Sequence, residues 1–305
     1  MRNHLQTLRL SYDITGDAYS TVLAIALKDP ETGKQSYLWS DYQYWIALRE
    51  WKKREEKALL FSKSNRNADG TYGLKGTNGR PVPTMSGLFE QIAPANVRYY
   101  TTLTCELLED YLFDLCYNLL GTNERKFMAL TGEMGTREFS RILMDKAAKF
   151  QLIDTTFVTG SGQNLTLGGQ FTTYKMTNGI ELTVKHCPLF DNMDMFRTLH
   201  PLTGKPLMSY TFLFIDLGQR DGQANIVKVC RKDREFTQWT TGGSVIPSGY
   251  AKNINTLRSN SRDGYQVHFL GEEGIMLRNP LSCGILYCDA EDSDLDNTID
   301  NVTMA

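Results

Sequence analysis

The sequence lacks the residue patterns that hold metals, bind nucleotides or supply a nucleophile. Its six cysteines contain no CxxC pair, and its four histidines include no HExxH spacing. A Walker loop, a GxSxG turn and a GxGxxG fingerprint are missing as well. These absences disfavour the common classes of enzyme and favour a structural or assembly protein. We therefore predict that the chain is not an enzyme and has no catalytic residue, cofactor or metal site.

Long apolar runs and an excess of positive charge are also missing. No run of about 18 apolar residues occurs, so a membrane span is not expected. Met1-Arg2-Asn3-His4 is followed by no apolar core of a signal peptide. The net charge is −2, whereas proteins dedicated to nucleic-acid binding are usually basic. A dedicated role in nucleic-acid binding is disfavoured, although local basic patches are not excluded.

The cysteines lie in apolar surroundings, and Cys283 and Cys288 fit no zinc spacing. We expect buried reduced thiols rather than disulfides or metal ligands, and hence synthesis inside a cell. The cysteines are Cys105, Cys116, Cys187, Cys230, Cys283 and Cys288.

A few polar residues remain as candidates for an unrecognised enzyme site. His186 stands beside Cys187 on an expected strand, where ordinary packing is favoured over a Cys/His dyad because no orienting acid can be named. Asp191 and Asp194 are three apart in an expected loop and could bind a cation, although such a pair is common. If the chain is an enzyme, these four residues are its candidates.

The N-terminal stretch predicts an extended ribbon. Leu8, Leu10, Tyr12 and Ile14 alternate with polar residues, which indicates a half-buried strand. Strands are also expected over 19–27 and 35–39, around a turn at 29–33 that contains proline and glycine. A lone hairpin is marginal in water, so the ribbon is expected to pack on something else, often another subunit.

One long charged helix is expected after the ribbon, over 42–62, with Ser40 or Asp41 as its N-cap. Its charge run is either a solvated face, which is favoured, or a face that meets an acidic partner or DNA. The basic residues concerned are Arg49, Lys52, Lys53, Arg54 and Lys57. The glycine-rich stretch 63–86 is expected to be a structureless loop that interacts or flexes.

Two further helices are expected before the chain turns to strands. The first covers 102–120, and its acids favour a solvated face over acid–base or metal chemistry: Glu106, Glu109, Asp110 and Asp114. A strand over 126–131, a glycine turn and a helix to about 150 capped by Thr136 follow. A helix N-terminus after such a turn could bind an anion, but a plain connection is favoured.

From residue 155 onward the pattern is mostly strand. A hairpin is expected over 165–187 around Asn178-Gly179, with apolar residues on both faces. On one face lie Ile180, Leu182 and Val184, and on the other Tyr174 and Met176. Further strands are expected over 207–217, 226–230, 265–269, 275–277 (after a turn at 271–274) and 284–288, before an acidic tail over 289–305 with six acids and no base.

This order of elements resembles a known family, the major capsid proteins of tailed double-stranded DNA phages with the Hong Kong 97 fold. The likeness is greatest to crAss-like phages of Bacteroidetes. It covers most of 8–288, and it is one of order and texture rather than of a single motif. The stretches that carry it are FVTGSGQNLTLGGQFTTYKMTNGIELTVKHCPLFDN (157–192), SYTFLFIDLG (209–218) and GYQVHFLGEEGIMLRNPLSCGILYC (264–288).

The resemblance implies an α+β fold and a division of the chain. It implies an N-terminal ribbon (1–39), a spine helix with peripheral elements (40–120), an axial strand–helix unit (121–156), a peripheral hairpin (157–200), axial strands (201–288) and a tail (289–305). It also implies self-assembly into hexamers and pentamers in a virion shell assembled in the host cytoplasm. Portal and decoration proteins and packaged DNA, met without sequence readout, are implied as partners. Little chain precedes the ribbon, so a long N-terminal arm is expected to be absent. The alternatives are a portal-adjacent or tail protein, or the enzyme considered above.

Overall fold

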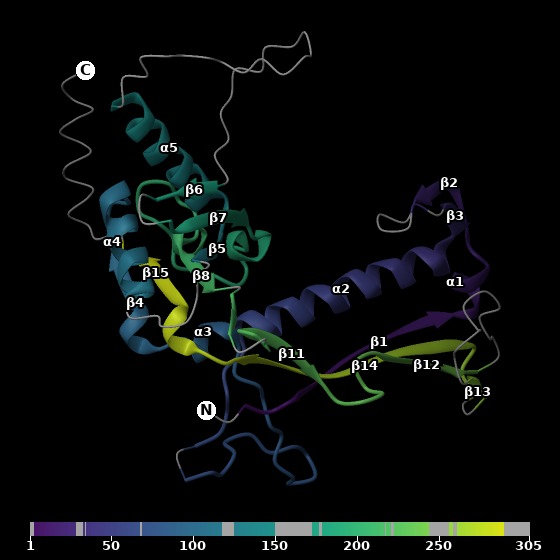
Figure 1. Cartoon of the computed structure of the whole chain (residues 1–305). Helices are drawn as coiled ribbons and strands as arrows, with labels where there is room; N and C mark the ends of the chain where they lie inside the picture. Colours follow the sequence, from purple (N-terminus) through teal and green to yellow (C-terminus); the bar gives the residue numbers. More distant parts are fainter. Residues whose placement is uncertain are drawn as a thin grey trace. The chain divides into compact units, whose positions relative to one another are not determined.

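The computed structural model shows an α+β chain that divides into two compact units (Figure 1). Unit 1 comprises Met1–Glu90 and Val227–Met276, and unit 2 comprises Gln91–Ile226 and Leu277–Ala305. Each unit is therefore built from two separate stretches, unlike the six consecutive segments implied above. The structure describes residues 3–28, 33, 35–67, 69–117, 125–149, 173–176, 179–216, 218–220, 223–243, 256–258 and 261–289.

Unit 1 combines one long helix with a mostly antiparallel sheet. Its strands follow the order β1-β14-β12-β13, and β11 also pairs with β14. The elements are β1 Gln6–Thr15, α1 Gly16–Ser20, β2 Val22–Lys28, β3 Gln35–Leu38, α2 Trp39–Phe61, β11 Ile226–Cys230, β12 Thr237–Gly242, β13 Thr256–Arg258 and β14 Gly264–Leu277. The short helix α3 Leu88–Gln91 lies at the boundary between the units.

The predicted N-terminal strand is confirmed, but its partner lies in its own chain. β1 pairs antiparallel with β14, from Gln6 opposite Glu273 to Thr15 opposite Gly264. Its alternating side chains pack with α2 around Trp51, which is 2% exposed. The expectation that this strand needs another subunit is therefore wrong. The predicted start of the next strand, at residue 19, is also wrong, because Tyr19 belongs to helix α1.

Within the predicted N-terminal ribbon, β2 and β3 form a separate two-stranded hairpin. They pair antiparallel, with Leu27 opposite Ser36 and Lys28 opposite Gln35, and the register shifts towards Val22. Gly33 has φ +70°, a conformation that favours glycine, and the other turn residues 29–32 lie outside the described residues.

Helix α2 begins three residues before its predicted start. Neither Ser40 nor Asp41 is its N-cap, because the chain passes directly from extended Leu38 into the helix at Trp39. The backbone N–H of Trp39 donates to the carbonyl of Thr21 at 3.2 Å, which satisfies one of the first N–H groups that have no partner within the helix. Ser40 is buried instead.

Unit 2 places helices on one face of a mixed sheet with the order β4-β15-β8-β5-β7-β6. Its core joins Leu108 and Tyr111 of α4 and Phe139 of α5 to Phe127 and Phe214 of the sheet. The elements are β4 Val97–Tyr100, α4 Cys105–Cys116, β5 Lys126–Thr131, α5 Glu133–Lys149, β6 Thr173–Lys175, β7 Glu181–His186, β8 Phe212–Asp216, β9 Gln219–Arg220, β10 Gln223–Ala224, β15 Gly284–Cys288 and the 3₁₀ turns Pro94–Asn96, Pro188–Asp191, Leu207–Tyr210 and Pro280–Ser282.

The hairpin predicted around Gly179 is present as β6 and β7, but its implied outside partner is not needed. β7 pairs in parallel with β5 along its whole length, so the sheet of unit 2 continues past the hairpin. Tyr174 and Met176 pack in the same core as Leu182 rather than on an opposite face. The predicted residues 165–172 and Asn178 lie outside the described residues.

Two strand boundaries differ from the prediction for local physical reasons. β14 runs without interruption through Gly271, where a turn was expected. A Cβ at Gly271 would lie 2.8 Å from the carbonyl of Glu235 and 2.9 Å from Trp51, so this glycine permits close packing rather than a turn. The strand expected from 207 starts at Phe212, after the 3₁₀ turn Leu207–Tyr210.

The cysteines follow the predicted burial only in part. Cys116, Cys283 and Cys288 are buried, whereas Cys105, Cys187 and Cys230 are half-buried. Burial raises the pKa of both Cys116 and Cys283 to about 11. In the part of the chain that the structure describes, no helix is long and apolar enough to cross a membrane.

Candidate assembly surfaces and polar clusters

A polar cluster at the start of α5 contains two of the four enzyme-site candidates. The Asp191 carboxylate lies 2.6 Å from Nε2 of His186 and accepts a hydrogen bond of 2.5 Å from the hydroxyl of Ser209. It also accepts a hydrogen bond from the backbone N–H of Glu133, at 3.0 Å. The N–H of Met134 donates to Ser209 at 3.1 Å.

This geometry stabilises a helix end rather than a reaction. A catalytic triad needs the histidine between the hydroxyl and the acid, whereas here Asp191 lies between Ser209 and His186. The carboxylate fills the N-terminus of α5, where unpaired N–H groups and the helix dipole favour an anion. The anion site considered from the sequence is thus occupied from within, and Thr136 is not the N-cap, because its hydroxyl donates to the carbonyl of Gly132.

The glycines of this turn allow the close approach. A Cβ at Gly132 would lie 2.4 Å from Asp191 Oδ1 and 2.7 Å from the Cα of Ser209. The second carboxylate of the predicted pair, Asp194, is exposed and does not join the cluster. Across the described ranges, no group of three or more His, Cys, Asp or Glu side chains is arranged to hold a metal ion. The role of Ser209 could not be predicted from the sequence, because nothing in the neighbouring residues indicates that its hydroxyl is buried and hydrogen-bonded.

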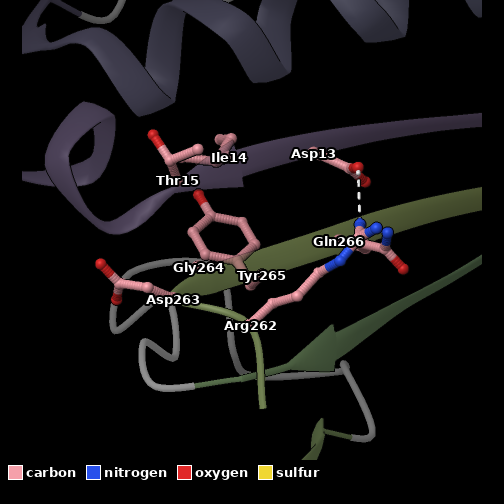
Figure 2. Close-up of a pocket in the computed structure, with 8 residues that line it drawn as sticks. All are labelled: Asp13, Ile14, Thr15, Arg262, Asp263, Gly264, Tyr265 and Gln266. Atoms are coloured by element: carbon pink, nitrogen blue, oxygen red, sulfur yellow. Dashed lines mark hydrogen bonds and ion pairs between the residues drawn. The ribbon is translucent and has the colours of Figure 1, made fainter. Parts of the chain in front are cut away.

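A cavity of about 300 Å³ lies in unit 1 where β1 ends and β14 begins (Figure 2). Its polar groups include Asp13 and Arg262, which form an ion pair of 3.5 Å across the cavity. Asp263 and Tyr265 lie at its other side. The guanidinium of Arg262 is already paired with the Asp13 carboxylate, so it does not present a free positive charge that would select an anionic ligand.

Unit 1 contains a cluster of charged side chains in which acids outnumber bases, and the sequence did not predict it. Lys228 of β11 forms ion pairs with Glu55 of α2, with Glu273 of β14 at 3.1 Å and with Glu235 at 3.7 Å. Glu273 is 1% exposed. The cluster ties the long helix to the sheet, but it holds one ammonium group for three carboxylates.

The excess of carboxylates in this cluster shifts the pKa values of its members. Burial disfavours the charge of Lys228, but its hydrogen bonds to Glu55 and Glu273 outweigh this and raise its pKa. Burial, and then the neighbouring carboxyl of Glu55, raise the pKa of Glu273 to about 7. Glu273 therefore takes up a proton close to neutral pH.

The basic run of α2 is largely exposed, as the sequence predicted for a solvated or partner-binding face. Arg49, Lys52, Lys53 and Arg54 are exposed, and Lys57 is half-buried. Arg54 pairs with Glu50 one turn earlier at 3.2 Å, which removes part of the positive charge. Arg49, Lys52 and Lys53 lie at helical spacing on one side of the helix.

The β2–β3 hairpin and the start of α2 expose apolar side chains. Val22 is 66% exposed, and Leu38 and Ile46 are also exposed. Exposed apolar groups that gather on one surface mark interaction sites. In the sheets that the structure describes, β2 and β3 pair only with each other, so an outside partner stays a prediction for this part of the ribbon.

Residues 63–86 are more ordered than predicted. Isolated bridges join Arg66 to Tyr72 and Lys75 to Pro81, and the N–H of Val82 donates to Leu74 at 3.0 Å. The side-chain amide of Asn65 donates to the carbonyl of Val82 at 2.6 Å. The described residues of this stretch form a hydrogen-bonded double turn, so "structureless" is wrong.

The acidic helix of unit 2 is only partly a solvated face. Asp114 pairs with Arg98 at 2.5 Å, and Glu109 accepts a hydrogen bond from the hydroxyl of Tyr174. Glu106 and Asp110 are exposed. The helix begins at Cys105 rather than near 102, and Thr104 caps it by accepting from the N–H of Leu107.

Comparisons with known proteins agree with one another. Residues 1–291 match the family described as Crassvirus major capsid protein. The chain is 29% identical over 302 residues to the "Major capsid protein" of Bacteroides phage crAss001, covering 92% of this chain and 58% of that protein. The chain thus spans well under two thirds of the length of this curated relative.

Solved structures extend the similarity to the fold. The holo-SrpI encapsulin complex from Synechococcus elongatus PCC 7942 matches with a TM-score of 0.50 and 10% identity, covering 93% of this chain and 73% of that chain. The capsid of Cyanophage P-SCSP1u matches with a TM-score of 0.45 and 10% identity, covering 95% of this chain and 74% of that chain.

Proposed function

The chain belongs to the Crassvirus major capsid protein family, and from that membership we propose that it builds the shell of a phage head by self-association. The family match over 1–291 is the observation that carries the proposal. The chain is a structural rather than a catalytic protein, and the α+β capsid fold of the Hong Kong 97 type fits its elements. The two clusters described above accordingly stabilise the fold.

We assign unit 1 to the peripheral domain and unit 2 to the axial domain. The long helix α2 in unit 1 has the place of a spine helix, and the β5–α5 pair in unit 2 has that of the axial strand–helix unit. The hairpin over 173–186 moves to the axial domain in this assignment, because β7 belongs to the sheet of unit 2.

The proposed assembly is a shell of hexamers and pentamers formed in the host cytoplasm and retained in the virion. Head-to-tail contacts between identical copies close into rings. Obligate interfaces of this kind commonly bury more than about 2,000 Å². The exposed β2–β3 hairpin would lie over a neighbouring copy. Portal and decoration proteins would complete the shell.

Assembly of the purified chain tests the proposal. We expect capsomers or shells by size-exclusion chromatography and negative-stain microscopy, whereas a monodisperse monomer at high concentration would contradict the proposal. Replacing residues 22–37 with a short glycine–serine linker should abolish assembly and leave both units folded. The linker is short because Val22 and Leu38 pair with each other. Residues 8–15 must be kept, because β1 belongs to the sheet of unit 1.

Two readouts distinguish lost assembly from lost folding. Tryptophan occurs only at 39, 45, 51 and 239, all within unit 1, so its fluorescence reports on unit 1. Far-UV circular dichroism reports on both units. A folded deletion variant that still assembles would show that the hairpin is not an intersubunit element.

We also propose that the basic face of α2 contacts packaged DNA without reading its sequence. Glutamate at positions 52 and 53 (Lys52→Glu with Lys53→Glu) should weaken binding of a labelled duplex. Two lost phosphate contacts lower the slope of log K against log salt by about 2. Fluorescence anisotropy across a salt series measures this slope. Arg197→Glu with Lys205→Glu, two exposed residues of unit 2, is the matched control. An equal slope change in both variants would mean that α2 has no particular role.

A further inference from the structure

The outer face of α4 combines acidic and aromatic side chains at regular spacing. Glu106, Asp110, Phe113 and Tyr117 are exposed, and they lie at positions i, i+4, i+7 and i+11 of one helix face. Tyr117, just beyond the last turn of α4, is 72% exposed, and its ring lies 5.8 Å from that of Phe113. Large exposed aromatic side chains are enriched in the centres of protein interfaces.

The outer face of α5 repeats this spacing with the opposite charge. Arg137, Arg141 and Met144 are exposed at positions i, i+4 and i+7. Among the side chains that the structure describes, none forms an ion pair with Glu106, Asp110, Arg137 or Arg141. Asp114 is not part of the pattern, because Arg98 already neutralises its carboxylate.

The two faces are complementary in a single alignment. Placed side by side in parallel, Glu106 meets Arg137, Asp110 meets Arg141 and Phe113 meets Met144, because both helices rise by the same distance between positions i and i+7. An antiparallel alignment would also match the charges, but it would set the exposed Met144 against the buried Leu103. Only the parallel alignment brings together both the oppositely charged side chains and the exposed apolar side chains of Phe113 and Met144.

The two faces cannot satisfy each other within one copy. α4 and α5 both pack their opposite sides on the core of the same unit, so both outer faces are exposed together. We propose that the outer face of α4 binds the outer face of α5 in a second copy of this chain. Each copy would then keep one acidic and one basic face for its neighbours, which is a head-to-tail contact of the kind that forms rings when the rotation between copies closes.

This inference rests on the proposed shell function and names one of its contacts. Charge reversal tests it. Variant A carries Glu106→Lys and Asp110→Lys, so both of its helix faces are basic, and variant B carries Arg137→Glu and Arg141→Glu, so both faces are acidic. Like charges set opposite each other across an interface are strongly unfavourable, so each variant alone should need at least about a tenfold higher concentration to assemble. Light scattering and negative-stain microscopy measure assembly.

Restoring complementarity should restore assembly. A chain with all four substitutions again has one acidic and one basic face, and it should assemble close to the original concentration. An equal mixture of A and B should also assemble, because each face of A then meets an opposite charge on B. Alternation of A and B closes a ring only when the number of copies is even, so the mixture should form six-membered but not five-membered rings.

Controls distinguish this inference from the proposed function. Circular dichroism must show that A and B are folded, and Arg197→Glu with Lys205→Glu changes the charge of the same unit by as much as variant B does, without touching either face. Raising the salt concentration screens exposed charges and should narrow the difference in assembly concentration between A, B and the original chain.

If the original chain assembles and folded A and B assemble equally well, the α4–α5 contact is wrong and the shell function stands. If the original chain stays monomeric, the shell function itself fails. If A and B fail but neither the mixture nor the fourfold variant recovers, the pairing of these two faces is also overturned.

Discussion

Replacing Lys228 with methionine is expected to lower the free energy of unfolding of unit 1 by about 3 kcal/mol at pH 8. Among the side chains that the structure describes, Lys228 is the only cation that forms an ion pair with Glu55 and Glu273. Its removal leaves two carboxylates side by side, one of them almost fully buried. The value is at the lower end for breaking a buried ion pair, because the side chain of Lys228 is itself 36% exposed.

The effect of this change should depend on pH in a definite direction. The pKa of Glu273 is raised in the folded protein to about 7, so between about pH 4.5 and 7 the folded state holds a proton that the unfolded state has lost. Through this group, stability is therefore highest at low pH and falls as the pH rises through that window. Without the ammonium group, Glu273 should hold its proton to still higher pH, so Lys228→Met should be less destabilising at pH 6 than at pH 8.

A double-mutant cycle isolates the charge effect from the loss of packing. Glu273→Gln on the Lys228→Met background removes the surplus negative charge and should recover most of the lost stability. Urea unfolding followed by tryptophan fluorescence reports on unit 1, since all four tryptophans belong to it. A Lys228→Met variant that loses the same stability at pH 6 and pH 8 would show that the buried carboxylates are not the cause.

Replacing Asp191 with alanine should be the most damaging single change in the polar cluster of unit 2. It removes the partner of the Glu133 N–H, of the Ser209 hydroxyl and of His186 together. Loss of an N-cap costs about 1 kcal/mol, and charge-assisted hydrogen bonds add about 1.5–3 kcal/mol each. These bonds share one carboxylate and do not add fully, so we expect a total loss of about 3 kcal/mol.

Asp194 supplies the matched control, because it is the other acid of the same pair and is exposed. Asp194→Ala should change stability by less than about 0.5 kcal/mol. The stability lost in Asp191→Asn should lie between the losses in the two alanine variants, because an amide oxygen still caps the helix without the negative charge. Urea unfolding followed by far-UV circular dichroism measures all three. Equal losses at 191 and 194 would disprove the capping role.

Local patterns predicted the elements of this chain better than their partners. The period of two in 8–14, the strand over 126–131 and the helical face of Phe139 and Ile142 are all found. These signals depend on neighbours in sequence. The partner of β1 lies at the far end of the chain, in β14, and nothing in residues 8–14 encodes its identity. A pattern that predicts burial does not say which surface supplies it.

The polar clusters were the least predictable part. His186 and Asp191 were named as candidates, but the role of Asp191 follows from Ser209 and Glu133, which are brought to it by the sheet. Lys228 stands in an apolar strand, and Glu273 stands in a stretch that reads as a turn. Gly271 explains that error, because glycine serves there for contact with Trp51 rather than for a bend.

The pairing of β1 with β14 sets an order of events during synthesis. Gln6 must wait for Glu273 before its strand has a neighbour, and the ribosome needs roughly 13–53 s to make the chain between them at about 5–20 residues per second. The apolar side of β1 and the Trp51 face of α2 are without the β14 part of their core during that interval. Unit 1 therefore folds late and as a whole, and a ribosome stalled before residue 264 holds a nascent chain whose first strand is still unpaired. Premature association of such chains is avoided only if they are kept apart until translation is nearly complete.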